Sequence, residues 1–203
     1  MREWIVTNGL GGYASLTHRN TNTRKYHGLL VASLKPPAQR WVFVSNVFDE
    51  LIYKDKKQDL RNLKNQFSFD VFPTFSCELN GIKIKKTVFM EHEKNTTILR
   101  YKIDTKKPFI LTHNPVLNSR HIYDVNRQRY LSFQHEFAND TITIKPDNSD
   151  KTLKIVLADT EYQPLQYWEE LFYSTDRERN ESWIDNNVHV GRFKKDIKDH
   201  FKL

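Results

Sequence analysis

Cysteine and glycine are scarce in this chain of 203 residues, and apolar residues never form a long run. The single cysteine, Cys77, excludes an internal disulfide, and its place in an alternating pattern predicts a buried, unreactive thiol. No stretch of about 18 apolar residues is present, so we expect no membrane span. The first residues also lack the apolar segment of a secretion signal. These absences predict a globular protein of the cytoplasm.

Motifs for metal binding and nucleophilic catalysis are missing as well. The segment from His92 begins like the zinc motif H-E-x-x-H, but Thr96 stands at its last position, and Asn139 ends the similar segment from His135. No G-x-S-x-G sequence supplies a nucleophile elbow. Acidic residues such as Asp49 and Glu50 have the pattern of solvated surface groups. We therefore predict no metal, no cofactor and no catalytic residue.

The formal net charge of +7 raises the question of nucleic-acid binding. The basic residues are scattered, however, in short clusters at positions 54–57, 83–86 and 194–198. Such scattering is typical of solvated strand faces and edges. A nucleic-acid ligand is not expected, and it would require an affinity that decreases steeply with salt.

Short segments rich in β-branched and aromatic residues fill most of the chain. They predict strands over residues 40–53, 67–79, 82–90, 96–104, 108–113, 129–137, 141–145, 153–158 and 188–197. The dipeptide Asn80-Gly81 predicts a tight hairpin, and Pro73 predicts a bulge or an edge position. Strands at this spacing, without alternating helices, favour a mainly β fold, an antiparallel sandwich.

Residues 163–173 differ from this pattern and predict a helix. Pro164 stands at its start, and Leu165, Trp168 and Phe172 would share one face. A second, charged helical turn is expected within residues 176–185. No repeat, linker or break in composition is visible, so we expect a single domain over residues 1–203.

A glycine-bearing segment lies between the apolar residues 4–6 and 29–32. Its composition disfavours a helix and predicts a loop between strands that offers backbone N–H groups and polar side chains to a ligand. The candidate site residues here are Asn8, Gly9, Gly11, Gly12, Tyr13, Arg24, Tyr26 and His27. The alternative is a glycine-bent connection that packs under its own aromatic residues.

The same glycines fit the spacing G-x-G-x-x-G/A of a dinucleotide-binding turn. That turn must open a helix, yet residues 15–23 have no helical periodicity. The acidic residue expected about 20 positions later is also missing, because the first acid after Glu3 is Asp49. Nucleotide binding is therefore not predicted.

The sequence of this segment resembles that of a known protein family. Residues 3–15, EWIVTNGLGGYAS, and 22–32, NTRKYHGLLVA, are similar to the N-terminal domain of glycogen debranching enzymes (amylo-α-1,6-glucosidases) of the bacterial and archaeal type. Further similar segments follow in the same order at 72–75, 88–90, 95–101 and 167–179. The resemblance thus covers nearly the whole chain. It implies an antiparallel β-supersandwich, galactose-mutarotase-like, that precedes an (α/α)6-barrel.

The family's barrel carries the two carboxyl groups that glycoside hydrolysis requires. This chain stops before such a barrel, so we expect no hydrolysis by it alone. The resemblance implies a non-catalytic domain that packs on the barrel as its partner and shapes a cleft for glycogen or another α-glucan. The alternative is a free-standing α-glucan-binding sandwich.

A second polar cluster lies at residues 114–123. The family usually reads Pro-hydrophobic-hydrophobic-Asn-x-Arg-Asp-x-His here; Asn118 and Arg120 match, whereas His121 replaces the Asp and Tyr123 replaces the His. Sugars are held by aromatic faces and by planar polar side chains, so Asn118 and Arg120 complete the candidate site. The alternative is that both clusters brace loops or dock onto the barrel.

Overall fold

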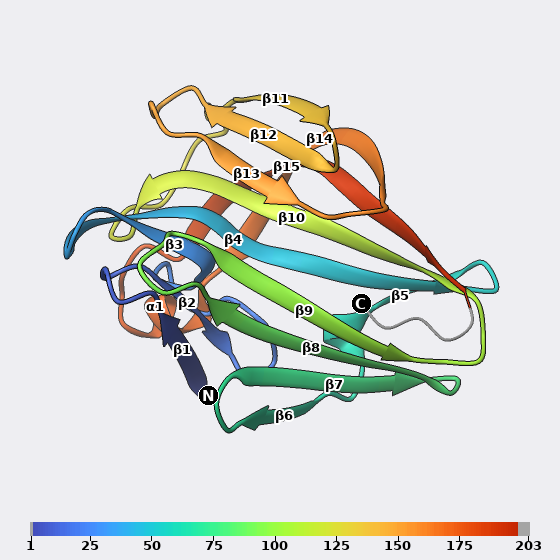
Figure 1. Cartoon of the computed structure of the whole chain (residues 1–203). Coiled ribbons are helices and arrows are strands. Elements are labelled where there is room, and N and C mark those ends of the chain that lie inside the picture. The colour runs from blue at the N-terminus through green and yellow to red at the C-terminus, as the bar shows by residue number, and fades with distance from the viewer. Residues whose placement is uncertain (1, 199–203) are drawn as a thin grey trace.

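The computed structural model describes residues 2–198 and consists mainly of antiparallel strands (Figure 1). The larger sheet has eight strands in the order β1-β2-β3-β4-β10-β15-β14, with β5 paired to β4. Its strands are β1 Glu3–Thr7, β2 Tyr13–Thr17, β3 Gly28–Lys35, β4 Ala38–Tyr53, β5 Lys56–Asp59, β10 Phe109–His121, β14 Glu161–Phe172 and β15 Ile184–Ile197.

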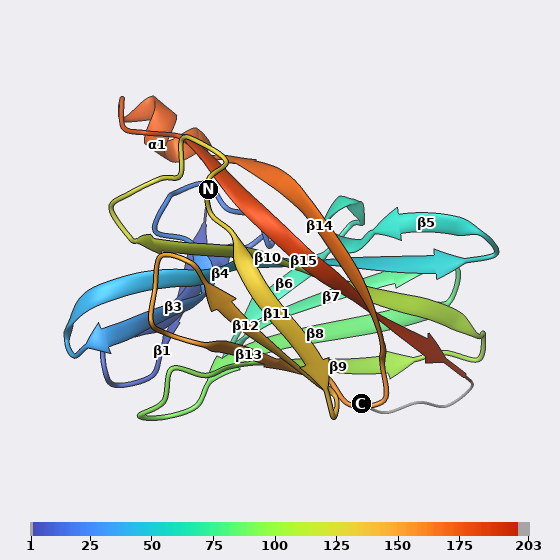
Figure 2. The same ribbon diagram turned by 90° about the horizontal axis from the view of Figure 1, so that it is seen from above.

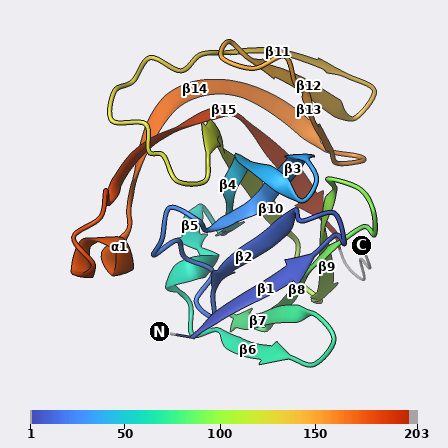
Figure 3. The same ribbon diagram turned by 90° about the vertical axis from the view of Figure 1, so that its left-hand side faces the viewer.

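Two smaller sheets form the second layer. One contains β6 Gln66–Phe69, β7 Pro73–Leu79, β8 Ile82–Met90 and β9 Thr97–Asp104, and the other contains β11 Phe133–Ala138, β12 Thr141–Pro146 and β13 Leu153–Val156. Figure 3 shows β7 and β8 beside β1 and β2, whereas β11–β13 lie over β14 and β15. The expected antiparallel β-sandwich is confirmed.

One apolar core joins the three sheets. Trp4 and Leu16 of the larger sheet share it with Val88 of one small sheet and Ile144 of the other, and each of these side chains is at most 2% exposed. Apolar burial of this kind stabilises a fold by about 25 cal/mol per Å². A single continuous core therefore holds both small sheets on the same face of the larger one.

The predicted hairpin at Asn80-Gly81 is confirmed. Leu79 pairs with Ile82, and both turn residues have positive φ, 54° for Asn80 and 80° for Gly81. Two left-handed residues are what a two-residue turn of type I′ requires, because its twist matches that of the strands. Pro73 begins β7 rather than bending it.

The helix predicted at residues 163–173 is wrong, because this segment is the edge strand β14. Trp168 lies opposite Val188 of β15 and packs on the core. Pro164 is tolerated because an edge strand leaves some backbone groups unpaired, and a register shift follows it. Pairing with β15 thus overrides an apolar spacing that fits a helix.

The helical content is small and lies elsewhere. The charged turn expected within residues 176–185 corresponds to α1, Ser174–Glu178, which Figure 2 shows at the connection from β14 to β15. A 3-10 helix, η1, covers Leu60–Asn62 after β5. No helix within residues 2–198 has the length and apolar character to cross a membrane.

The strands β10 and β15 extend well beyond their predicted bounds. β10 continues to His121, and β15 begins at Ile184. The prediction missed these extensions because they consist largely of polar residues.

The environments of Asp49 and Cys77 also differ from the prediction. Asp49, expected at the surface, is only 2% exposed since it pairs with buried Lys86. Cys77 is half-buried, and burial together with the charge of Asp49 raises its pKa to about 11, which leaves the thiol protonated at neutral pH.

We predict that Gly191→Ala destabilises the sheet. A Cβ at this position would overlap the ring of Tyr162, whose hydroxyl donates to the Val190 carbonyl at 2.9 Å. Overpacking of this kind costs about 1–3 kcal/mol, measurable by urea unfolding. In a Tyr162→Ala background the added methyl group has room, and the cost should largely vanish; an equal cost in both backgrounds would refute this explanation.

Candidate functional site

The prediction of one continuous loop over the glycine segment is wrong, because β2 lies within it. Residues 8–12 form the turn between β1 and β2, and residues 18–27 connect β2 to β3. The Oδ1 atom of buried Asn8 accepts hydrogen bonds from the N–H groups of Leu10 and Gly12, at 2.9 and 3.0 Å. Its Nδ2 atom donates to the Lys94 carbonyl at 2.9 Å and to Oδ1 of Asn95 at 3.1 Å. Asn8 therefore fixes the turn and joins it to the loop that precedes β9.

The glycines of this turn allow close packing. Gly11 has φ of 93°, and a Cβ there would lie 2.8 Å from the carbonyl oxygen of Pro37. Gly9 also has positive φ, and a Cβ on Gly12 would meet Nδ2 of Asn8 at 2.7 Å. These contacts give the turn a structural role, and contact with a ligand stays a prediction for Asn8, Gly9, Gly11 and Gly12.

Tyr13, Arg24 and Tyr26 lie around the connection from β2 to β3. The hydroxyl of Tyr13 donates to the Tyr26 carbonyl at 2.7 Å, and burial raises its pKa to about 12. Arg24 pairs with Glu3 at 2.8 Å on the surface. The hydroxyl of Tyr26 reaches Glu181 at 3.4 Å. Two hydrogen bonds and one ion pair of these side chains thus stabilise the connection.

His27 is buried in the same connection. Its Nδ1 atom accepts a hydrogen bond from the N–H of Thr23 at 3.0 Å, and Nε2 lies 3.7 Å from a carboxylate oxygen of Glu3. Burial lowers the pKa of His27 from 6.5 to about 4, although the Glu3 carboxylate opposes this shift. The imidazole is therefore neutral at pH 7.

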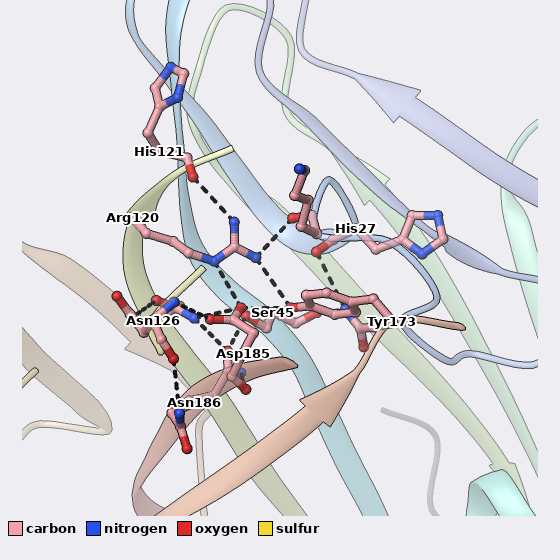
Figure 4. A network of polar contacts seen from close by, with 12 residues as sticks. His27, Ser45, Arg120, His121, Asn126, Tyr173, Asp185 and Asn186 are labelled. Atoms are coloured by element: carbon pink, nitrogen blue, oxygen red, sulfur yellow. Dashed lines mark hydrogen bonds and ion pairs between the residues drawn. The ribbon is translucent and has the colours of Figure 1, made fainter. Parts of the chain in front are cut away.

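A buried ion pair between Arg120 and Asp185 lies at the centre of the polar network in Figure 4. Nε of Arg120 donates to Oδ2 of Asp185 at 2.8 Å, and Nη2 donates to the Lys25 carbonyl at 2.8 Å. The hydroxyl of Tyr173 donates to the same carboxylate oxygen at 2.7 Å. The three side chains are at most 3% exposed, so the charges of Arg120 and Asp185 are stabilised by each other and by hydrogen bonds in place of water.

Asparagine side chains extend this network across the sheet. Asn118 donates to Asp185 at 3.1 Å and to Oδ1 of Asn187 at 2.8 Å, and Asn187 accepts a further bond from Ser45 at 2.7 Å. The backbone N–H of Asn126 donates to the second oxygen of Asp185 at 2.8 Å. The structure therefore brings the predicted Asn118 and Arg120 together in one site.

Asp185 is a central residue that the sequence prediction missed. Its neighbours Trp183 and Ile184 gave no sign of an acid facing inward, and its segment was expected to be helical. The one hint was Arg120 itself, because a buried arginine requires an acid as its partner, although the sequence does not say which acid. β15 supplies that acid.

The network holds the backbone of Lys25 from two sides. Arg120 binds its carbonyl, and Oδ2 of Asp176 in α1 accepts its N–H at 2.6 Å. Nζ of Lys25 also pairs with Glu181 at 2.7 Å. Burial raises the pKa of Asp176. Because Lys25 is fixed, the position of the next residue, Tyr26, is fixed as well.

Four aromatic side chains form an adjacent surface feature, which we call the aromatic row. It consists of Tyr26, Tyr123, His121 and Trp41, whose successive ring centroids are 5.7, 5.2 and 6.4 Å apart. Tyr123 is 62% exposed, and Nε1 of Trp41 donates to Ser119 at 3.0 Å. The row contains both positions at which the sequence departs from the family pattern, and the rings of His121 and Tyr123 are neighbours in it.

The chemistry of this region suits recognition of a neutral polar ligand. Exposed aromatic faces lie next to charged groups such as Lys25 and Glu181, which form hydrogen bonds. Within residues 2–198, no three side chains of His, Cys, Asp or Glu gather at a spacing that could hold a metal ion. The arrangement therefore supports binding through ring faces and planar polar groups.

The fold and this site define a β-sandwich domain with an aromatic and polar surface. The family "Glycogen debranching enzyme N terminal" matches residues 2–202, and the chain belongs to this family. A comparison with curated proteins found no match. Among solved structures, a putative kojibiose phosphorylase from the human microbiome is similar with 13% sequence identity and a TM-score of 0.43. The similarity covers 95% of this chain but 29% of that one.

We predict that Asp185→Asn strongly destabilises the protein. The substitution leaves the buried charge of Arg120 without its anion, which costs about 3–5 kcal/mol. Urea unfolding measures the loss. The matched control is Asp150→Asn, because Asp150 forms an equally short but exposed ion pair with Lys151 and should change stability little. Equal effects of the two substitutions would contradict the central role of the buried pair.

We predict that protonation of His27 destabilises the fold between pH 6.5 and about 4. In this window the unfolded chain binds a proton that the native state does not, so the free energy of unfolding decreases as the pH falls. The loss reaches about 3 kcal/mol below the lower pKa. Asp176, whose raised pKa favours the native state at low pH, acts in the opposite direction.

The His27→Gln variant isolates this effect, because glutamine still accepts a hydrogen bond but does not titrate. Urea unfolding at several pH values should show a smaller slope for the variant than for the wild type. Parallel curves would mean that His27 does not titrate on unfolding.

Proposed function

We propose that this chain is the non-catalytic N-terminal domain of an α-1,6-glucosidase that acts in glycogen breakdown. The match of the family over residues 2–202 carries the proposal. The domain spans residues 1–203, packs on an (α/α)6-barrel and contributes part of the surface that binds the α-glucan. Asn118 and Arg120 hold the connection that presents Tyr26, while Tyr13, Arg24 and His27 brace it.

The aromatic row is the part of the surface that suits a glucan best. Glucose units offer C–H faces that pack on aromatic rings and hydroxyl groups that require hydrogen bonds. Tyr123 offers an exposed ring, and Tyr26 lies beside Glu181 and Lys25. The fixed backbone at Lys25 reduces the entropy lost on binding.

Two buried acids of the domain, Asp185 and Asp49, form ion pairs. Asp185 is paired with Arg120, and Asp49 with Lys86. The charge of Lys86 and hydrogen bonds from its neighbours lower the pKa of Asp49 to about 2, against the effect of burial. Asp49 is therefore not suited to donate a proton at neutral pH, and we expect the barrel to supply the catalytic acids.

A second candidate function is a free-standing α-glucan-binding module. The exposed aromatic row favours it, because such a surface can bind without a catalytic domain. The coding sequence that follows residue 203, in frame or as the next gene, distinguishes the two: helical repeats with paired acids support the enzyme domain. Their absence would remove the main support for a role in debranching.

We predict that glycogen retards the chain in affinity electrophoresis and that Tyr123→Ala weakens this binding. Loss of one ring contact costs about 1 kcal/mol, or roughly fivefold in affinity. The matched control is Tyr130→Ala, since Tyr130 is 79% exposed and lies outside the aromatic row. If both variants bind as the wild type does, the row is not the binding surface. Absence of any retardation of the wild type would exclude a free-standing module.

A further inference from the structure

An apolar groove separates the two small sheets. Figure 1 shows β9 and β13 on either side of β3, β4 and β10, and no hydrogen-bond ladder joins β9 to β13 within the described residues. The groove has a volume of about 650 Å³ and is lined by residues from all five strands. Protein interiors rarely contain spaces much larger than a water molecule, so a space of this size marks a place for another molecule.

The walls of the groove are largely hydrocarbon. Phe43 and Val47 of β4 form part of its floor, and Leu99 and Ile155 face it from the two small sheets. Its rim includes exposed apolar side chains, with Ile98 at 37% and Val156 at 66% exposure. A glucan would find few hydrogen-bond partners on these walls, so the groove requires a less polar ligand than the aromatic row does.

The groove also contains one histidine with an unused nitrogen. His113 of β10 lines the groove, and its side chain is 6% exposed. Its Nδ1 atom lies 2.7 Å from Oδ1 of Asp49, whereas Nε2 forms no hydrogen bond among the residues that the structure describes. Because His113 lines the groove, a ligand bound there can supply a hydrogen-bond partner for this nitrogen.

The groups behind His113 fix its hydrogen-bonding role. Asp49 accepts hydrogen bonds from Lys86 at 2.8 Å and from the Tyr101 hydroxyl at 2.9 Å. Because this carboxylate accepts from Nδ1–H, the neutral imidazole has its lone pair on Nε2. The free nitrogen then requires an O–H or N–H donor. Tyr101 packs on the ring with centroids 4.7 Å apart and keeps it in place.

We propose that this groove binds a small amphipathic molecule with an apolar body and one hydroxyl group, and that the hydroxyl donates to Nε2 of His113. The groove lies within the usual volume range of small-molecule sites, roughly 300–1,000 Å³. Asn95 and Thr97 also line the groove but donate hydrogen bonds to the carbonyls of Ser33 and Leu29, so His113 offers the acceptor that orients the ligand. A polypeptide strand, the other possible occupant, would pair with the edges of β9 and β13 and would not require His113.

The test compares two probes with the chain in solution: 4-propylphenol, which has a hydroxyl donor, and 4-propylanisole, which has none. Saturation-transfer NMR and calorimetric titration measure their binding. We expect the phenol to bind about fivefold more tightly, the contribution of one net hydrogen bond. Contacts in NMR spectra should connect the ligand with Phe43, Leu99 and Ile155.

Two variants control the test. His113→Phe keeps a ring of similar size without the nitrogen, so the preference for the phenol should vanish while the anisole still binds. Leu30→Trp fills part of the groove without touching Asp49, and it should weaken both ligands. If His113→Phe does not fold, this second variant and the ligand contacts in the wild type decide. Equal affinity of the two probes for the wild type would overturn the proposal. Ligand contacts at the aromatic row in place of the groove would overturn it as well. If neither probe binds, the proposal is also wrong, and a polypeptide strand is then the remaining occupant.

Discussion

The site depends on one buried ion pair. Arg120 and Asp185 come from adjacent strands, β10 and β15, and neither reaches solvent. An isolated charge at this depth would destabilise the fold, so every other member of the network serves to satisfy these two groups. The arginine also binds the backbone of Lys25 and thereby places Tyr26 on the surface. A structural requirement of the core thus determines the geometry of the surface around Tyr26.

The two faces of the larger sheet have different chemistry. One face packs on the small sheets through apolar residues such as Leu16 and Phe193, and the split between those sheets leaves the groove. The other carries the network of Asn118, Asp185 and Asn187. The aromatic row and the groove therefore share no residues, so the two proposed binding sites are independent of each other.

The strands with alternating apolar residues and the tight hairpin turn were predicted from the sequence, whereas the long polar strands were not. The hairpin at Asn80-Gly81 follows from local backbone preferences. β14 was mistaken for a helix, because Leu165, Trp168 and Phe172 have a spacing that fits one and only the partner strand β15 decides otherwise. Asn118 and Arg120 were identified through the family resemblance, but their partner Asp185 lies 65 residues away from Arg120 and has no local signal.

The sequence by itself determined the β-sandwich and the family, because alternating side chains, turn residues and long motifs are local properties of the chain. The tertiary structure decided which polar residues meet. It separated the turn of Asn8 and Gly12 from the network of Arg120, and it placed His121 and Tyr123 in one aromatic row with Tyr26. It also buried Asp49 beside Lys86 and His113. The physical reason is that buried charge is compensated only by groups brought close in space, and distance along the chain does not predict which groups these are.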